Sequence, residues 1–214
     1  YDPVKDLQPI TNVIAAPLVI VSHPSFPAKN AKDLIAYAKA KPDAITFGSP
    51  GNGTIGHLSM ELLKTMAGIK MLHIPYKGGA PATLDTVTGQ AQVIFTAATQ
   101  TLPHVKAGRL RMLGVTRATR APLFPDVPAI AETVPGFSAE LWYALFAPAG
   151  TPADIINRLH REAGTVLAQA EIKSKLADQG VDALTRSPQE MTKQIAIDLD
   201  KWARVVKDTG ARIN

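Results

Sequence analysis

Two glycine-rich turns, Gly48–Thr54 and Lys77–Pro81, restrict the fold of this chain more than any other feature of its sequence. Each turn follows a short strand-like run, Ala44–Phe47 or Met71–Ile74, and precedes a segment with the apolar periodicity of a helix. A third strand-like run lies at Ala91–Phe95, so the pattern predicts a βαβαβ unit. Right-handed crossovers make such a unit a parallel sheet with helices on its faces, and ligands bind outside the carboxyl ends of its strands.

Apolar patterns predict further elements on both sides of this unit. A long strand is expected over Ile10–Val21, with Pro17 at an edge position or at a break near its middle. A helix is expected to start at the cap Asn30 and to end at Pro42. After the βαβαβ unit, a helical stretch is predicted around Leu102–Lys106, and further strands at Leu110–Val115 and Leu141–Ala147.

The last third of the chain has a helical pattern. Thr151 and Ser187 each stand before a proline and an acidic residue, which is the signature of a capped helix start. After Ser187, one apolar stripe typical of a packing surface continues to Gly210; its members are Met191, Ile195, Leu199, Trp202 and Val206. Asp198 and Asp200 are expected on the solvated side of this helix.

Composition limits the function classes. The 214 residues are 46% hydrophobic, which supplies cores for one large or two small domains, and no apolar run reaches the roughly 18 residues of a membrane span. The net charge of +5 favours anionic partners. The basic residues are scattered and aromatic residues make up only 6%, so no nucleic-acid partner is predicted. The absence of cysteine excludes disulfides and thiolate metal sites.

The segment Gly51–Gly56 fits the G-x-G-x-x-G fingerprint of dinucleotide sites, because it follows a predicted strand and opens a helix. An NAD site also needs an acidic residue about 20 positions further on. No acidic residue lies between Glu61 and Asp85. Lys77 can in principle meet a ribose phosphate, which leaves NADP as the weaker alternative to an anion site.

The same turn is suited to an anion. Its glycines let the backbone approach a ligand, and the unpaired N–H groups of the helix start point outward. An ordinary turn in which Ser49 and Thr54 only cap the helix fits the sequence equally well. Hydroxyls at the end of the third strand extend the edge. The candidate ligand-binding residues are Ser49, Gly51, Asn52, Gly53, Thr54, His57, Thr96, Ala97 and Thr99.

Catalytic motifs are not found in the sequence. It contains no G-x-S-x-G elbow and no H-E-x-x-H, and no nucleophile and base stand together by spacing. The histidines are not paired at metal-ligand spacing; they are His23, His57, His73, His104 and His160. We therefore predict no catalytic residue, no metal and no cofactor, although residues distant in the sequence can still meet in the fold.

Several motifs, in order along essentially all of the chain, resemble the Bug family, the periplasmic solute receptors of tripartite tricarboxylate transporters. These are Tyr1–Leu7, Ser49–Thr54 with His57 and Leu58, Pro75–Ala82, Ala107–Arg111, Phe124–Pro128 and Leu145–Pro152. The resemblance implies a type II periplasmic-binding-protein-like α/β fold, with two lobes whose parallel-type sheets are flanked by helices. Lobe 2 is then expected at residues 16–145, and lobe 1 at 1–15 and 146–214. Family members usually begin with a strand and turn that this chain lacks, so lobe 1 is expected to be incomplete.

The resemblance implies a periplasmic receptor that captures a small carboxylate-bearing anion for the membrane components of its transporter, without entering the membrane or catalysing a reaction. The natural precursor is expected to be longer at its N-terminus and to carry an export signal. Trp142 is expected either to close one side of the ligand cleft or to belong to the core. Two alternatives stay open, namely an NADP-dependent oxidoreductase and a stand-alone sensor or interaction module.

Overall fold

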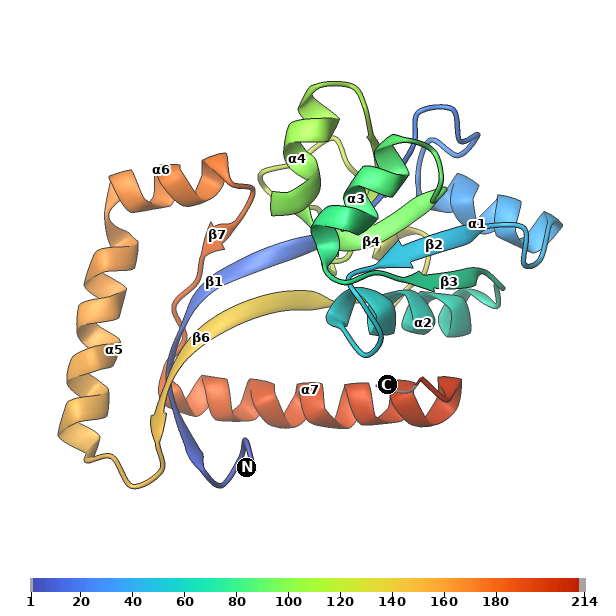
Figure 1. Cartoon of the computed structure of the whole chain (residues 1–214). Coiled ribbons are helices and arrows are strands. Elements are labelled where there is room, and N and C mark those ends of the chain that lie inside the picture. The colour runs from blue at the N-terminus through green and yellow to red at the C-terminus, as the bar shows by residue number, and fades with distance from the viewer. Residues whose placement is uncertain (1, 212–214) are drawn as a thin grey trace. The chain divides into compact units, whose positions relative to one another are not determined.

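The computed structural model describes residues 2–211, which group into two compact units (Figure 1). Unit 1 consists of residues 2–16 and 142–202, and unit 2 consists of residues 17–141 and 203–211. The lobe limits that the resemblance implies stay a prediction. Units 1 and 2 differ from the expected lobes mainly at residues 203–211, which group with unit 2.

Unit 2 is built on a mixed sheet with the strand order β3-β2-β4-β1-β5. Strands β2 (Thr46–Ser49), β3 (Leu72–Pro75) and β4 (Val93–Ala97) run parallel, as the strand–helix alternation predicts. Strand β1 (Leu7–Ser22) lies between β4 and β5 (Arg111–Val115) and is antiparallel to both. The α/β class is confirmed, but the sheet is mixed and not wholly parallel.

Strand β1 is not an edge strand in unit 2, so the edge position considered for Pro17 is wrong. Residues 18–22 of β1 pair with β4 on one side, and residues 19–22 pair with β5 on the other. Before Pro17, Ile14 and Ala15 pair with β7 (Asp182–Ala183), and β6 (Glu140–Pro148) also pairs with β1. Pro17, which lacks an N–H group, therefore stands where the chain passes from unit 1 into unit 2 and β1 changes its partners.

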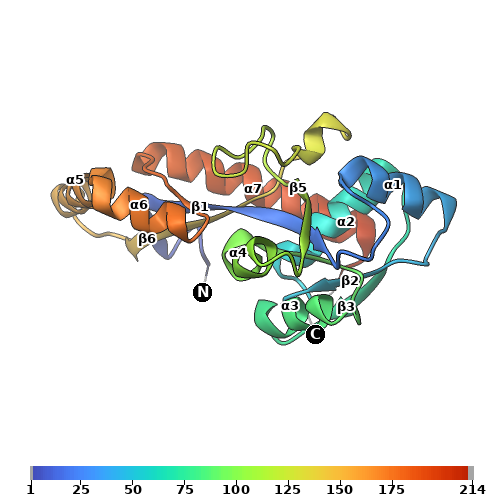
Figure 2. The ribbon, with the colours of Figure 1, turned by 90° about the horizontal axis from the view of Figure 1, so that it is seen from above.

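Helices cover both faces of the sheet of unit 2 (Figure 2). Helices α1 (Ala31–Ala40) and α2 (Ile55–Ala67) lie on one face, and α3 (Gly79–Val87) and α4 (Ala98–Lys106) lie on the other. A 3₁₀ turn, η1 (Ile130–Glu132), follows β5 along the chain. The start predicted for α1 is confirmed, because the Asn30 side chain accepts from the N–H of Asp33. Helix α2 ends at Gly68, which has a left-handed backbone conformation.

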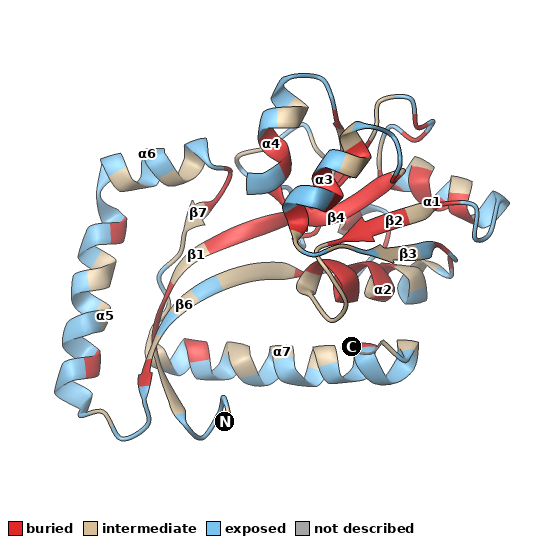
Figure 3. Ribbon diagram, in the orientation of Figure 1, coloured by how far each residue is buried: buried red, intermediate tan, exposed pale blue. Residues whose placement is uncertain are grey.

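The core of unit 2 lies on the two sides of its central strands (Figure 3). Val19, Val21 and Ile94 are fully buried against the small residues Ala82 of α3 and Ala98 of α4. The alternate residues of the same strands, among them Leu18, Ile20 and Phe95, are equally buried. Because both faces are covered, β1 and β4 have continuous apolar runs in place of alternation.

Unit 1 contains α5 (Ala153–Ala168), α6 (Ala170–Asp178) and most of α7 (Pro188–Thr209). The predicted cap at Ser187 is present, because its hydroxyl and its N–H both lie 2.8 Å from Glu190 Oε2. Within unit 1, much of the apolar face of α5 is open to solvent: Ile155, Leu159 and Val166 are 44% to 49% exposed. In the described part of the chain, no helix has both the length and the apolarity that crossing a bilayer requires.

Trp142 and Asp198 meet within unit 1. The indole N–H of Trp142 donates to Asp198 Oδ2 at 2.8 Å, and both side chains are partly buried. The expectation that Asp198 lies on a solvated face is therefore wrong. A hydrogen bond to a carboxylate fixes the ring of Trp142 against α7.

Candidate functional site

Three helix starts meet at the carboxyl edge of the parallel strands of unit 2, because β2, β3 and β4 lead directly into α2, α3 and α4. Two backbone hydrogen bonds join the first two turns. Tyr76 N donates to Ser49 O at 3.1 Å, and Gly78 N donates to Pro50 O at 2.9 Å. The two glycine-rich turns of the sequence therefore form one continuous edge, as expected for a ligand site of an open α/β sheet.

The three helix starts differ in their capping. At α2, the hydroxyl of Thr54 accepts from His57 N at 3.4 Å and donates to the carbonyl of Gly51 at 2.7 Å. The N-cap residues of α3 and α4, Gly78 and Ala97, make no side-chain capping bond. The first N–H groups of a helix have no partner within the helix, and its dipole favours negative charge there. The edge is therefore rich in donors suited to an anion.

Two glycines allow the close backbone packing of this edge. Gly51 has a φ of 142°, and a Cβ there would lie 3.1 Å from the carbonyl oxygen of Tyr76. Gly56, in the first turn of α2, lies so close to β4 that a Cβ would collide with the carbonyl oxygen of Phe95. The bare backbone at these positions brings the start of α2 directly onto the end of the sheet.

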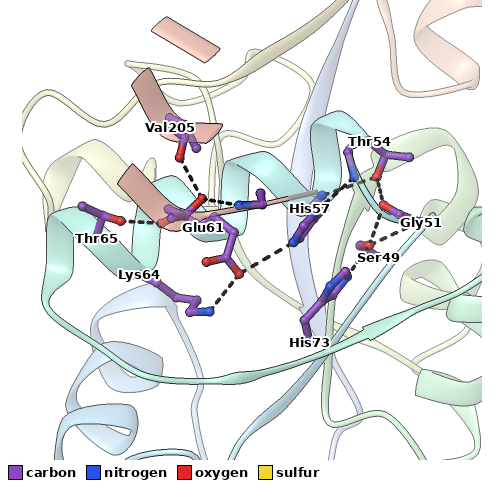
Figure 4. A network of polar contacts seen from close by, with 12 residues as sticks. Ser49, Gly51, Thr54, His57, Glu61, Lys64, Thr65, His73 and Val205 are labelled. Atoms are coloured by element: carbon purple, nitrogen blue, oxygen red, sulfur yellow. Dashed lines mark hydrogen bonds and ion pairs between the residues drawn. The ribbon is translucent and has the colours of Figure 1, made fainter. Parts of the chain in front are cut away.

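Beneath the first turn lies a polar cluster that spacing along the chain did not predict (Figure 4). The Ser49 hydroxyl lies 2.7 Å from His73 Nε2, and Gly53 N donates to His57 Nδ1 at 3.1 Å. The rings of His57 and His73 stack with centroids 4.0 Å apart and planes within 7°. His73 also stacks on Phe47, at 4.7 Å. These contacts join α2, β2 and β3 under the turn.

Burial favours the neutral form of both imidazoles of this cluster by lowering their pKa values. The pKa of His73 is lowered to about 4, mainly by burial and in smaller part by the neighbouring His57 and Lys64. Burial also lowers the pKa of His57, against the attraction of Glu61, which raises it. Glu61 is itself held by Lys64, whose Nζ lies 2.8 Å from Glu61 Oε1. Two uncharged rings can stack face to face without the repulsion that two cations would feel.

We expect the free energy of unfolding to fall as the pH drops from about 6.5 to about 4. In this window His73 is neutral when folded and becomes protonated when unfolded, so the unfolded state binds more protons. Urea denaturation followed by circular dichroism measures the effect. A His73→Phe variant keeps an aromatic ring but cannot titrate, so its stability should fall less over this window; an equal fall in both proteins would contradict the assignment.

The residues predicted at the end of the third strand lie where β4 leads into α4, with no loop between them. Thr96 and Ala97 end β4, and Thr99 lies in the first turn of α4. The hydroxyl of Thr96 donates to Gln100 Oε1 at 2.8 Å, whereas Thr99 is exposed. The strand therefore leads into a helix start here as well, which adds N–H donors to the edge.

The other predicted site residues divide into two sets. Ser49 is fully buried, and His57 is 6% exposed with its Nδ1 engaged by Gly53. Asn52 and the backbone of the turn are partly exposed. Sequence reasoning missed His73, although it stands two residues before Pro75, in the strand that leads into the second glycine turn.

Ser49 and His73 form a serine–histidine contact that no motif indicated, but its geometry does not suit catalysis. Ser49 has no exposed surface, and its hydroxyl also contacts the backbone of Gly51, with both the N–H and the carbonyl at 3.2 Å. A nucleophile needs access to its substrate, so we interpret this contact as part of the turn. Within residues 2–211, no group of histidine and carboxylate side chains is arranged to hold a metal ion.

A helix-flanked sheet with donor-rich helix starts at one edge is the arrangement in which α/β domains bind ligands. The family model described as "Tripartite tricarboxylate transporter family receptor" matches residues 1–211. The chain belongs to this family, whose members are periplasmic receptors and not enzymes. The resemblance to the Bug proteins is thereby confirmed.

Individual relatives agree with this assignment. Protein BugT of Bordetella pertussis is 34% identical over 214 residues, which is 100% of this chain and 66% of BugT. The structure of Rpa4515 of R. palustris with adipate is 33% identical, with a TM-score of 0.88 over 99% of this chain and 71% of that one. MatC of Rhodopseudomonas palustris with bound malate is 26% identical, with a TM-score of 0.81 over 96% and 71% of the two chains. The chain thus spans just under two thirds of the length of BugT.

Proposed function

We propose that this chain is the ligand-binding part of a receptor that captures a small dicarboxylate for a tripartite tricarboxylate-type transporter. The observation that carries the proposal is the edge of unit 2, where the starts of α2, α3 and α4 gather, two of them without a side-chain cap. The relatives with adipate and malate both hold dicarboxylates, which supports this ligand class. The net charge of +5 favours the approach of such an anion.

Binding requires no bond to be made or broken. We infer that one carboxylate accepts hydrogen bonds from the N–H groups of Ile55 and Gly56 at the start of α2, which the helix itself does not satisfy. The side chains of Asn52 and Thr99 supply further donors at the same edge. Ser49 and His57 act from beneath, by shaping the turn. Periplasmic location and docking to the membrane components of the transporter belong to the same proposal.

A thermal-shift and calorimetric titration of the chain with adipate and malate tests the proposal. At 100 times the dissociation constant, a ligand that binds only the folded state adds about 2.7 kcal/mol to the free energy of unfolding. Dimethyl adipate, which has the same chain without the negative charges, is the matched control and should give no shift. NADP tests the dinucleotide alternative in the same assay. A shift with NADP and none with any dicarboxylate would overturn the proposal.

A further inference from the structure

His57 and His73 are two titratable side chains buried together under the turn that binds the ligand in the function proposed above. Each ring holds one glycine of the turn. His57 Nδ1 accepts the N–H of Gly53 at 3.1 Å, and His73 reaches Gly51 through the Ser49 hydroxyl. The rings also hold each other, since their centroids are 4.0 Å apart.

We propose that the stacked His57 and His73 are positioning residues, which hold the turn 49–54 in its anion-binding conformation only while both rings are neutral. The inference rests on the proposed function for its ligand, but its structural part concerns the turn alone. It makes carboxylate binding weaken at acidic pH by more than the protonation of the ligand's own carboxylates alone would cause.

The chemistry of His57 explains the dependence. In the neutral ring, Nδ1 carries the lone pair that accepts from Gly53, so the proton is on Nε2. Protonation places a second donor on Nδ1, facing the donor N–H of Gly53, and this hydrogen bond is lost. The charged ring is attracted instead to Glu61 Oε1, which lies 3.8 Å from Nε2. Protonation therefore favours a ring position that no longer holds Gly53.

The charged groups around the two rings do not favour the protonation of both rings at once. The charged groups facing the rings are Glu61 and Lys64 of α2, and these two already form an ion pair. From β2, Phe47 stacks on His73 and the Ser49 hydroxyl lies against it, and neither of these side chains titrates in this range. The part of α7 that groups with unit 2 carries the charged residues Arg204, Lys207 and Asp208, but the main causes of the pKa shifts of the two rings are burial and residues of α2.

The test compares adipate affinity at pH 7.5 and pH 4.0, where His73 begins to be protonated, in the unmodified chain and in two variants of His57. Between pH 7.5 and pH 4.0 the unmodified chain should lose about tenfold more affinity than the His57→Asn variant, the loss expected for one buried hydrogen bond. His57→Asn places an amide oxygen where Nδ1 stood and cannot be protonated, so its affinity should fall with pH only as far as the protonation of adipate itself requires. His57→Ala has no acceptor and should bind weakly at both pH values. Equal pH dependence in the unmodified chain and His57→Asn would overturn the proposal.

A ligand-free measurement separates this inference from the proposed function. The amide signals of Gly51 and Gly53 should shift together in nuclear magnetic resonance spectra as the two imidazoles titrate, and His73→Gln should alter the shift of Gly51 most. If no dicarboxylate binds but the amides follow the imidazoles, the proposed ligand is wrong and the positioning role stands. If the amide chemical shift of Gly53 does not change when His57 is protonated, the positioning role is wrong, whichever ligand the chain binds.

Discussion

Replacing Gly56 with alanine should lower the free energy of unfolding by about 2 kcal/mol, although alanine is the better helix former. The added Cβ would collide with the carbonyl oxygen of Phe95 and would lie 3.0 Å from Pro50 Cδ. Phe95 belongs to the central strand β4, and Pro50 belongs to the turn, so neither can move without disturbing the edge. Urea denaturation followed by circular dichroism measures the loss.

A second helical glycine provides the control for this prediction. Gly164 lies within α5, and a Cβ there would meet only Thr185 Cγ2, at an ordinary 3.7 Å. Gly164→Ala should therefore stabilise its helix, by up to about 1 kcal/mol. If the two variants changed stability in the same direction, the close approach of α2 to β4 would not be the reason for glycine at position 56.

Replacing Gly51 with alanine should weaken adipate binding about tenfold or more. With a φ of 142°, this position costs a residue with a side chain about 1–3 kcal/mol of strain. The Cβ would also press on the Tyr76 carbonyl at 3.1 Å. The turn relieves both effects by moving, which displaces the N–H groups at the start of α2 from the carboxylate. Calorimetric titration at pH 7.5 gives the affinity.

Gly68 is the matched control, because it ends the same helix with a φ of 63° and a Cβ there would meet no atom within 4 Å. Gly68→Ala should cost about 1 kcal/mol of stability, from the same kind of backbone strain. It should leave the adipate affinity as it is, since it lies at the far end of α2 from the turn. Equal losses of affinity in the two variants would mean that Gly51 acts only through general stability.

Much of the fold could be predicted because its signals are local. The strand predicted at Ala44–Phe47 is found two residues later, at Thr46–Ser49, and both this strand and the cap at Thr54 depend on a few neighbouring residues. The same holds for the capping box at Ser187. Periodicity and capping chemistry act over one or two turns of chain, so a single sequence reveals them.

The place of β1 could not be predicted in this way. Its apolar run indicated a strand, but its antiparallel pairing with β4 and β5 joins residues more than 70 positions apart. Pro17 is compatible with an edge, a break or, as found, a change of partners between two units. A one-dimensional pattern does not distinguish these cases, because strand partners are chosen by packing over the whole unit.

The candidate site shows the same division. The glycines, Thr54 and the helix starts are visible in the chain as a turn suited to an anion, and the motifs around them identified the family. The stacking of His57 on His73 and the burial of Ser49 arise only when α2 and β3 pack against β2. Burial and hydrogen bonding set the charge and the role of a side chain, and both depend on neighbours that are distant in the sequence. The sequence suggests that His57 contacts the ligand. In the folded structure His57 instead accepts a hydrogen bond from the backbone of the turn, and we propose that this turn contacts the ligand.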